Sequence, residues 1–170
     1  MSDNNAMVAD SRAVEITVLG VGNPIMGDDG VGLELLAGVR AALDGASPGI
    51  EFIDGGTGGM ELLPIVQDAQ RLLVLDAVAG DEPGDVKVLT GDQVVRMLSL
   101  KLSPHQVGLL DVFTAARLLG HEPQTVVIVG VVPETVDLCV GLSAPVQASL
   151  PRAVSRAVAQ IRSWLAEARP

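Results

Sequence analysis

Aromatic residues are scarce in this chain of 170 residues, which has two phenylalanines, one tryptophan and no tyrosine. Basic residues are scarce too: 11 lysines and arginines stand against 21 aspartates and glutamates, which leaves a formal net charge of −10. Nucleic-acid binding depends on a basic surface, and single-strand binding also depends on aromatic stacking. The composition therefore argues against nucleic acid as a partner.

Cysteine and long hydrophobic runs are almost absent. Cys139 is the only cysteine, which excludes an internal disulfide, and it has no basic neighbour, so we expect a buried, inert thiol. The longest apolar run, at 126–132, is far shorter than the roughly 18 residues that suggest a membrane span. Segment 1–13 is polar and acidic and does not resemble a signal peptide. We expect it to be a flexible tail on a cytoplasmic protein whose single domain covers 14–168.

Short apolar runs alternate with helical periods along the chain. Most of the strand candidates are continuously apolar, which is typical of strands buried on both faces. The turn-rich segment 77–85 is too short for a parallel crossover, so the strand after it should run antiparallel. We predict a three-layer α/β/α sandwich around a mostly parallel five-stranded sheet with one antiparallel strand. The expected strands are 15–19, 50–53, 72–76, 86–89 and 125–132, and the expected helices are 31–43, 60–69, about 105–119, and about 145–165 with a kink or restart at Pro151.

The most informative segment follows the first expected strand. Its apolar run ends at a Gly-Val-Gly-Asn sequence, and Asp28 and Asp29 then precede an amphipathic stretch, which predicts a strand, a tight loop and a helix start. Loops at the carboxyl ends of parallel strands are where open α/β sheets bind ligands. A dinucleotide-binding motif is excluded, because its third glycine position holds Ile25. Either aspartate could simply cap the helix, but adjacent like charges disfavour both doing so, which leaves one as a candidate site residue.

Three further segments carry candidate site residues. Asp54 leads into the glycine-rich stretch 55–59, which is either a loop with an Asx turn or exposed backbone for a peptide or an anion. Asp76 ends an apolar strand, and His105 opens a helix after a proline. Together with Asp29 they offer two carboxylates and one imidazole. That set suits a divalent transition metal with open positions, and it also suits general acid–base chemistry.

At this point the chain resembles the NiFe-hydrogenase maturation endopeptidases. The resemblance runs in order over nearly the whole sequence and is specific, because five unusual blocks coincide. The blocks are GVGNPIMGDDGVG at 20–32, DGGTGGMELL at 54–63, LDA at 75–77, SPHQVGLLDV at 103–112 and VGVVPE at 129–134.

The resemblance implies a peptidase that is monomeric and cytoplasmic. Such an enzyme cuts a C-terminal extension from a NiFe-hydrogenase large-subunit precursor after nickel has entered that subunit. Nickel carried by the substrate would then meet Asp29, Asp76 and His105, which are the expected catalytic and metal-contacting residues. The family often has Glu at the first of these positions, so Asp28 is the alternative to Asp29.

The glycine-rich loop would lie beside the substrate tail. Its expected substrate-binding residues are Asp54, Gly55, Gly56, Thr57 and Gly58. Two alternatives use the same residues: a metallohydrolase that holds its own zinc, and a non-catalytic chaperone of the metallated subunit. The absence of a His-Glu-x-x-His sequence counts against an ordinary zinc protease.

Overall fold

The computed structural model describes residues 15–44, 48–99 and 104–167. Five strands form one sheet in the order β2-β1-β3-β5-β4. Neighbouring strands are parallel except for β4, which runs antiparallel to β5. This arrangement confirms the predicted sheet, including the reversed strand. The strands are β1 (Ile16–Val21), β2 (Ile50–Gly56), β3 (Arg71–Ala77), β4 (Val86–Thr90) and β5 (Thr125–Val131).

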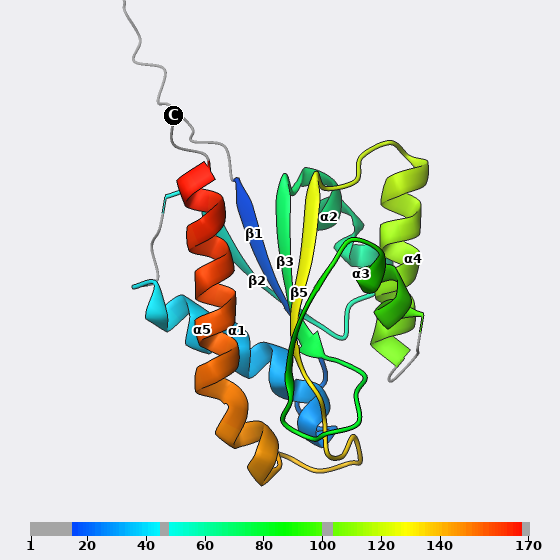
Figure 1. Cartoon of the computed structure of the whole chain (residues 1–170). Coiled ribbons are helices and arrows are strands. Elements are labelled where there is room, and N and C mark those ends of the chain that lie inside the picture. Colours follow the sequence, from blue (N-terminus) through cyan, green and yellow to red (C-terminus); the bar gives the residue numbers. More distant parts are fainter. Residues whose placement is uncertain (1–14, 45–47, 100–103, 168–170) are drawn as a thin grey trace, which may run out of the picture.

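Helices cover both faces of the sheet, as the predicted three-layer sandwich requires (Figure 1). One layer contains α1 (Val31–Ala42) and α5 (Ala144–Glu167), which pack against each other. The other layer contains α2 (Leu63–Asp68), α3 (Asp92–Leu98) and α4 (Pro104–Leu118). Two short 3-10 turns, η1 (Gly27–Gly30) and η2 (Met60–Leu62), precede α1 and α2. Among the described helices, none combines the length and the apolar character needed to cross a membrane.

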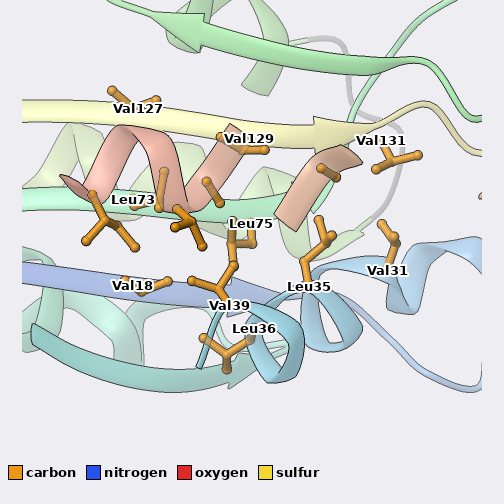
Figure 2. Close-up of a cluster of buried hydrophobic side chains, with 14 of the residues drawn as sticks. Val18, Val31, Leu35, Leu36, Val39, Leu73, Leu75, Val127, Val129 and Val131 are labelled. Atoms are coloured by element: carbon orange, nitrogen blue, oxygen red, sulfur yellow. The ribbon is translucent and has the colours of Figure 1, made fainter. Parts of the chain in front are cut away.

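Two apolar cores hold these layers to the sheet. Alternate residues of β3 point to opposite faces, so that Leu73 and Leu75 join the core under α1 and α5, while Leu72 and Val74 join the core under the other layer. Figure 2 shows the first core, where side chains of β1, β3 and β5 meet the apolar stripe of α1. Every residue of β3 after Arg71 is buried, which explains why its sequence is continuously apolar from Leu72 to Leu75.

Two helical expectations need correction. The sequence prediction missed α3, whose buried residues Val94, Met97 and Leu98 have helical spacing but occupy only seven residues of helix. Helix α5 does not restart at Pro151, because it is helical throughout Ala144–Glu167. Pro151 is exposed and removes one backbone donor. The buried stripe that runs the length of α5, from Val146 to Trp164, compensates for that loss.

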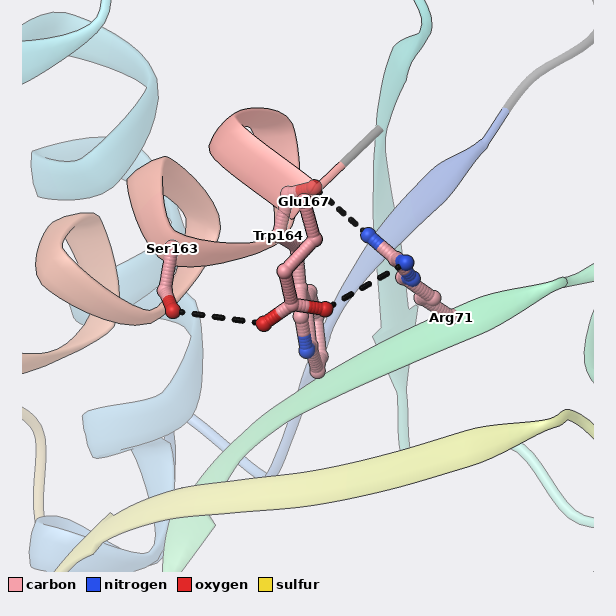
Figure 3. Close-up of polar contacts among 4 residues, drawn as sticks. All are labelled: Arg71, Ser163, Trp164 and Glu167. Atoms are coloured by element: carbon pink, nitrogen blue, oxygen red, sulfur yellow. Dashed lines mark hydrogen bonds and ion pairs between the residues drawn. The ribbon is translucent and has the colours of Figure 1, made fainter. Parts of the chain in front are cut away.

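The C-terminal end of α5 is tied to the start of β3. The Arg71 Nη1 atom donates a hydrogen bond of 2.6 Å to the Trp164 carbonyl oxygen, and its Nη2 atom lies 3.4 Å from a Glu167 carboxylate oxygen (Figure 3). A cation at the last turn of a helix satisfies open carbonyl groups and complements the helix dipole. This contact fixes α5 at the end of the sheet opposite the candidate site.

Candidate active site

The candidate site lies at the carboxyl ends of the parallel strands, where α1 and α5 begin (Figure 1). Two loops meet there. The β1–α1 loop and the β5–α5 loop are joined by backbone hydrogen bonds from Gly27 N to the Cys139 carbonyl (2.8 Å), from Asp28 N to the Thr135 carbonyl (3.1 Å) and from Cys139 N to the Ile25 carbonyl (3.1 Å). Because β3 lies between β1 and β5 in the sheet, this junction crosses the carboxyl end of β3.

The Asp28 carboxylate also joins the two loops through hydrogen bonds. The side chain is fully buried and accepts four hydrogen bonds from the β5–α5 segment. The donors are Glu134 N (2.8 Å), Thr135 N (3.2 Å), Ser143 N (2.6 Å) and the Ser143 hydroxyl (2.7 Å). The role of Ser143 was not predicted from the sequence. No local pattern could reveal it, because its partner is 115 residues away.

The expectation that one of the paired aspartates caps the helix is wrong. Neither η1 nor α1 has a side-chain capping hydrogen bond at its start. The donors around Asp28 belong to a distant segment instead. Burial by itself raises the pKa of Asp28, but the hydrogen bonds from Ser143, Glu134 and Thr135 outweigh burial and hold the pKa below its ordinary value of 3.8.

Asp28→Asn is expected to destabilise the fold by about 2–4 kcal/mol, because an amide removes the charge that four donors stabilise. The folded chain binds a proton at Asp28 only at a lower pH than the unfolded chain does. The stabilisation is therefore present above the unfolded pKa and is lost as the pH falls through the folded value. Urea unfolding of both chains between pH 7 and pH 3 measures this difference. If the difference in unfolding free energy between wild type and Asp28→Asn did not decrease as the pH falls, the charge-based explanation would be contradicted.

Asp29 and Asp76 are two further buried acids at this end of the sheet. Asp29 is 3% exposed, and its Oδ2 atom accepts a hydrogen bond of 3.1 Å from Asn23 N. Asp76 is fully buried, and its Oδ1 atom accepts a hydrogen bond of 2.7 Å from Ala77 N. The η1 turn that carries Asp29 lies against β3, which carries Asp76. Two nearly inaccessible carboxylates on contacting elements are costly for folding and are typical of functional sites.

The glycine-rich loop lies beside the same site. Asp54 forms the expected Asx turn, since its Oδ1 atom accepts a hydrogen bond of 2.9 Å from Gly56 N. Gly56 in turn accepts a hydrogen bond of 2.8 Å from Gly22 N, which joins the loop to the end of β1. On the far side, a Cβ atom built on Gly108 of α4 would lie 3.2 Å from the Gly59 Cα atom. The loop therefore lies between the end of β1 and the first half of α4.

His105 belongs to the first turn of α4, one turn before Gly108. Its side chain lies outside the described part of the structure, as does Ser103, so the predicted grouping of His105 with Asp29 and Asp76 stays a prediction. Among the described residues, no group of three or more His, Cys, Asp or Glu side chains forms a metal site.

His121 follows α4 and is exposed. Cys139 is also exposed, which corrects the expectation of a buried thiol. The reason is its position in the junction: the Cys139 backbone pairs with Ile25 and Gly27, and residues 137–141 around it contribute no side chain to either core.

Comparison with known proteins identifies the family. A family model described as hydrogenase maturation protease (HycI) matches residues 44–160, more than half of the chain. The chain belongs to the hydrogenase maturation protease family. It is therefore a protease of hydrogenase maturation, and the expected enzyme class is confirmed.

The relatives cover most of this hydrogenase maturation protease. The hydrogenase 2 maturation protease of Escherichia coli K12 is 34% identical over 159 residues, which are 92% of this chain and 96% of that protein. The hydrogenase expression/formation protein HupD of Rhizobium leguminosarum is 37% identical over 155 residues, which are 89% of this chain and 76% of that protein. The solved structure of the hydrogenase maturating endopeptidase HybD from E. coli has a TM-score of 0.80 at 34% identity, over 88% of this chain and 93% of that one. The fold predicted from the sequence is thus shared with a solved relative.

Proposed function

We propose that this protease removes a C-terminal extension from the large-subunit precursor of a NiFe hydrogenase after nickel insertion, acting as a monomer in the cytoplasm. Nickel belongs to the substrate in this proposal and meets the protease at Asp29, Asp76 and His105. Hydrolysis adds water across one peptide bond, leaving a new C-terminal carboxylate on the large subunit and a free amine on the released peptide.

The observation that carries the proposal is that the two adjacent aspartates have different structural surroundings. The carboxylate of Asp28 is engaged by four donors from its own chain and serves the loop junction. Asp29 lies on the same turn, against the strand that carries buried Asp76. This supports Asp29, rather than Asp28, as the acid that works together with Asp76.

Carboxylate and imidazole ligands suit the proposed role of the substrate metal. They bind divalent nickel through hard or borderline donors, and such contacts exchange more readily than thiolate contacts. Docking the nickel-bearing end of the precursor on these residues would place the tail over the site. The substrate metal could then serve recognition alone, or also polarise the scissile carbonyl or activate water.

The glycine-rich loop is the proposed support for the tail. Its residues Asp54, Gly55 and Gly56 end β2, which is an edge strand of the sheet, and Thr57 and Gly58 follow it. A loop with few side chains exposes its backbone to an extended peptide. The contact of this loop with α4 near Gly108 supports its position next to the turn that contains His105.

Intact-mass measurement of the nickel-loaded precursor from the same cell tests the proposal. Incubation with the protease should remove one C-terminal peptide and leave the rest of the precursor unchanged. A stable complex with an unchanged precursor mass would favour the chaperone alternative. Cleavage of generic peptides by a protein that copurifies with stoichiometric zinc would favour the metallohydrolase alternative.

Asp29→Glu should keep cleavage within about tenfold of the wild-type rate, a cost of at most about 1.4 kcal/mol, because the carboxylate is retained and only one methylene is added. Asp29→Asn should lose cleavage. Initial rates on the nickel-loaded precursor measure both variants. If Asp29→Asn cleaved normally while folded Asp28→Asn did not, the assignment within the pair would be reversed.

A further inference from the structure

Large apolar side chains are exposed on the loop junction beside the candidate site. Ile25 is 53% exposed, Leu138 is 78% exposed and Val140 is 87% exposed. We propose that these three residues, the docking patch, bind an apolar surface on the folded body of the large-subunit precursor while its tail occupies the site. This inference rests on the proposed function and adds the surface that holds the substrate.

The docking patch is formed by two segments that are far apart in the sequence. Met26 and Cys139 pair as an isolated parallel bridge, and the hydrogen bonds from Gly27 and Cys139 close it. This pairing brings Ile25 of the β1–α1 loop next to the segment that holds Leu138 and Val140. The patch therefore depends on the tertiary contact between the loops.

The segment under the docking patch is held in place on both sides. Asp28 binds Thr135 and Ser143, the residues that flank the segment with Leu138 and Val140. Gly27 has a positive φ of 57°, and a Cβ atom there would lie 2.9 Å from the Cys139 Sγ atom. The exposed side chains thus project from a fixed loop, which lowers the entropy lost when a partner binds.

The position of the docking patch identifies its occupant. The junction crosses the carboxyl end of β3, where Asp76 lies, so a protein whose tail reaches Asp76 must also lie against the loops around it. The chain as a whole carries a net charge of −10, yet the patch presents three uncharged aliphatic side chains. Exposed apolar clusters typically mark protein interaction sites. An apolar face of the precursor next to its tail satisfies both requirements.

Cys139 provides a direct test, because it is exposed, lies between Leu138 and Val140, and is the only cysteine of the chain. The rate of its alkylation by iodoacetamide can be followed by the intact mass of the protease. An excess of nickel-loaded precursor should slow this alkylation at least about fivefold, since a covered thiol reacts only when the complex opens. An unchanged rate would overturn the inference. Slowing that depends on protease concentration without precursor would assign the patch to a second copy of this chain and also overturn it.

A double variant tests the contribution to binding. Leu138→Ser with Val140→Ser should raise KM for the nickel-loaded precursor about tenfold or more and leave kcat nearly unchanged, because the apolar contact is lost and the site is intact. Val95→Ser with Leu118→Ser is the matched control, since both residues are exposed, on α3 and α4, and outside the junction. Wild-type KM for the patch variant would overturn the inference, whereas absence of cleavage by the wild-type protease would overturn the proposed function. The alkylation rate still tests the docking patch in that second case.

Discussion

Asp76→Asn is expected to abolish cleavage of the nickel-loaded precursor, with a loss of at least about 100-fold in initial rate, because removing a charged ligand or polarising group at a metal-assisted site costs this much or more. The variant should still fold. An asparagine is nearly isosteric with Asp76, and its amide oxygen can keep the hydrogen bond from Ala77 N. Initial rates and thermal unfolding of the same preparation measure the two effects separately.

His105→Ala should show the same loss of rate. His105 lies in the first turn of α4, and the control is His121, the other histidine of the chain, which is exposed beyond the opposite end of α4; His121→Ala should cleave normally. Full cleavage by Asp76→Asn or by His105→Ala would remove that residue from the proposed site. An unfolded Asp76→Asn protein would instead show that the carboxylate is needed for the fold.

Gly32→Ala is expected to have the largest effect on stability. Gly32 lies in the first turn of α1, and a Cβ atom there would overlap the carbonyl oxygens of Val21 and Leu75. Both atoms belong to the backbone of buried strands and cannot move away independently. We expect a loss of about 3 kcal/mol or more, since overpacking against rigid backbone displaces a whole element.

Chemical denaturation measures this loss, and Gly120→Ala is the matched control. Gly120 has a positive φ of 73°, but nothing lies within 4 Å of an added Cβ atom, so its substitution should cost only about 1 kcal/mol. Equal effects at Gly32 and Gly120 would contradict the close approach of α1 to the sheet.

The sheet could be predicted because its signals are local. β3 and β5 are apolar along most of their length since both faces are covered, and the connection before β4 is too short to cross the sheet. Helix α3 was missed because three buried residues within seven give a weak periodic signal. The behaviour of Pro151 could not be predicted, since it depends on how firmly the rest of α5 packs against α1 and β5.

The sequence could place the candidate site at the pair of aspartates but could not tell which of the two belongs to it. Asp28 and Asp29 are adjacent, and the local pattern gives both the same role. The structure separates them, because Asp28 binds donors more than 100 residues away while Asp29 lies on a turn that contacts β3. Long-range hydrogen bonds of this kind leave no periodic trace in the sequence. The exposure of Cys139 was missed for the same reason.

The nickel dependence of cleavage is the most direct test of the central claim. The claim is that this protease recognises nickel in its substrate through Asp29, Asp76 and His105. The measurement is the initial rate of C-terminal peptide release, by intact mass, from the same precursor with and without nickel. We predict release from the nickel-loaded precursor and none from the nickel-free one, with wild-type protease at equal concentration. Equal release from both precursors would contradict the claim, because the substrate metal would then have no part in recognition or in cleavage.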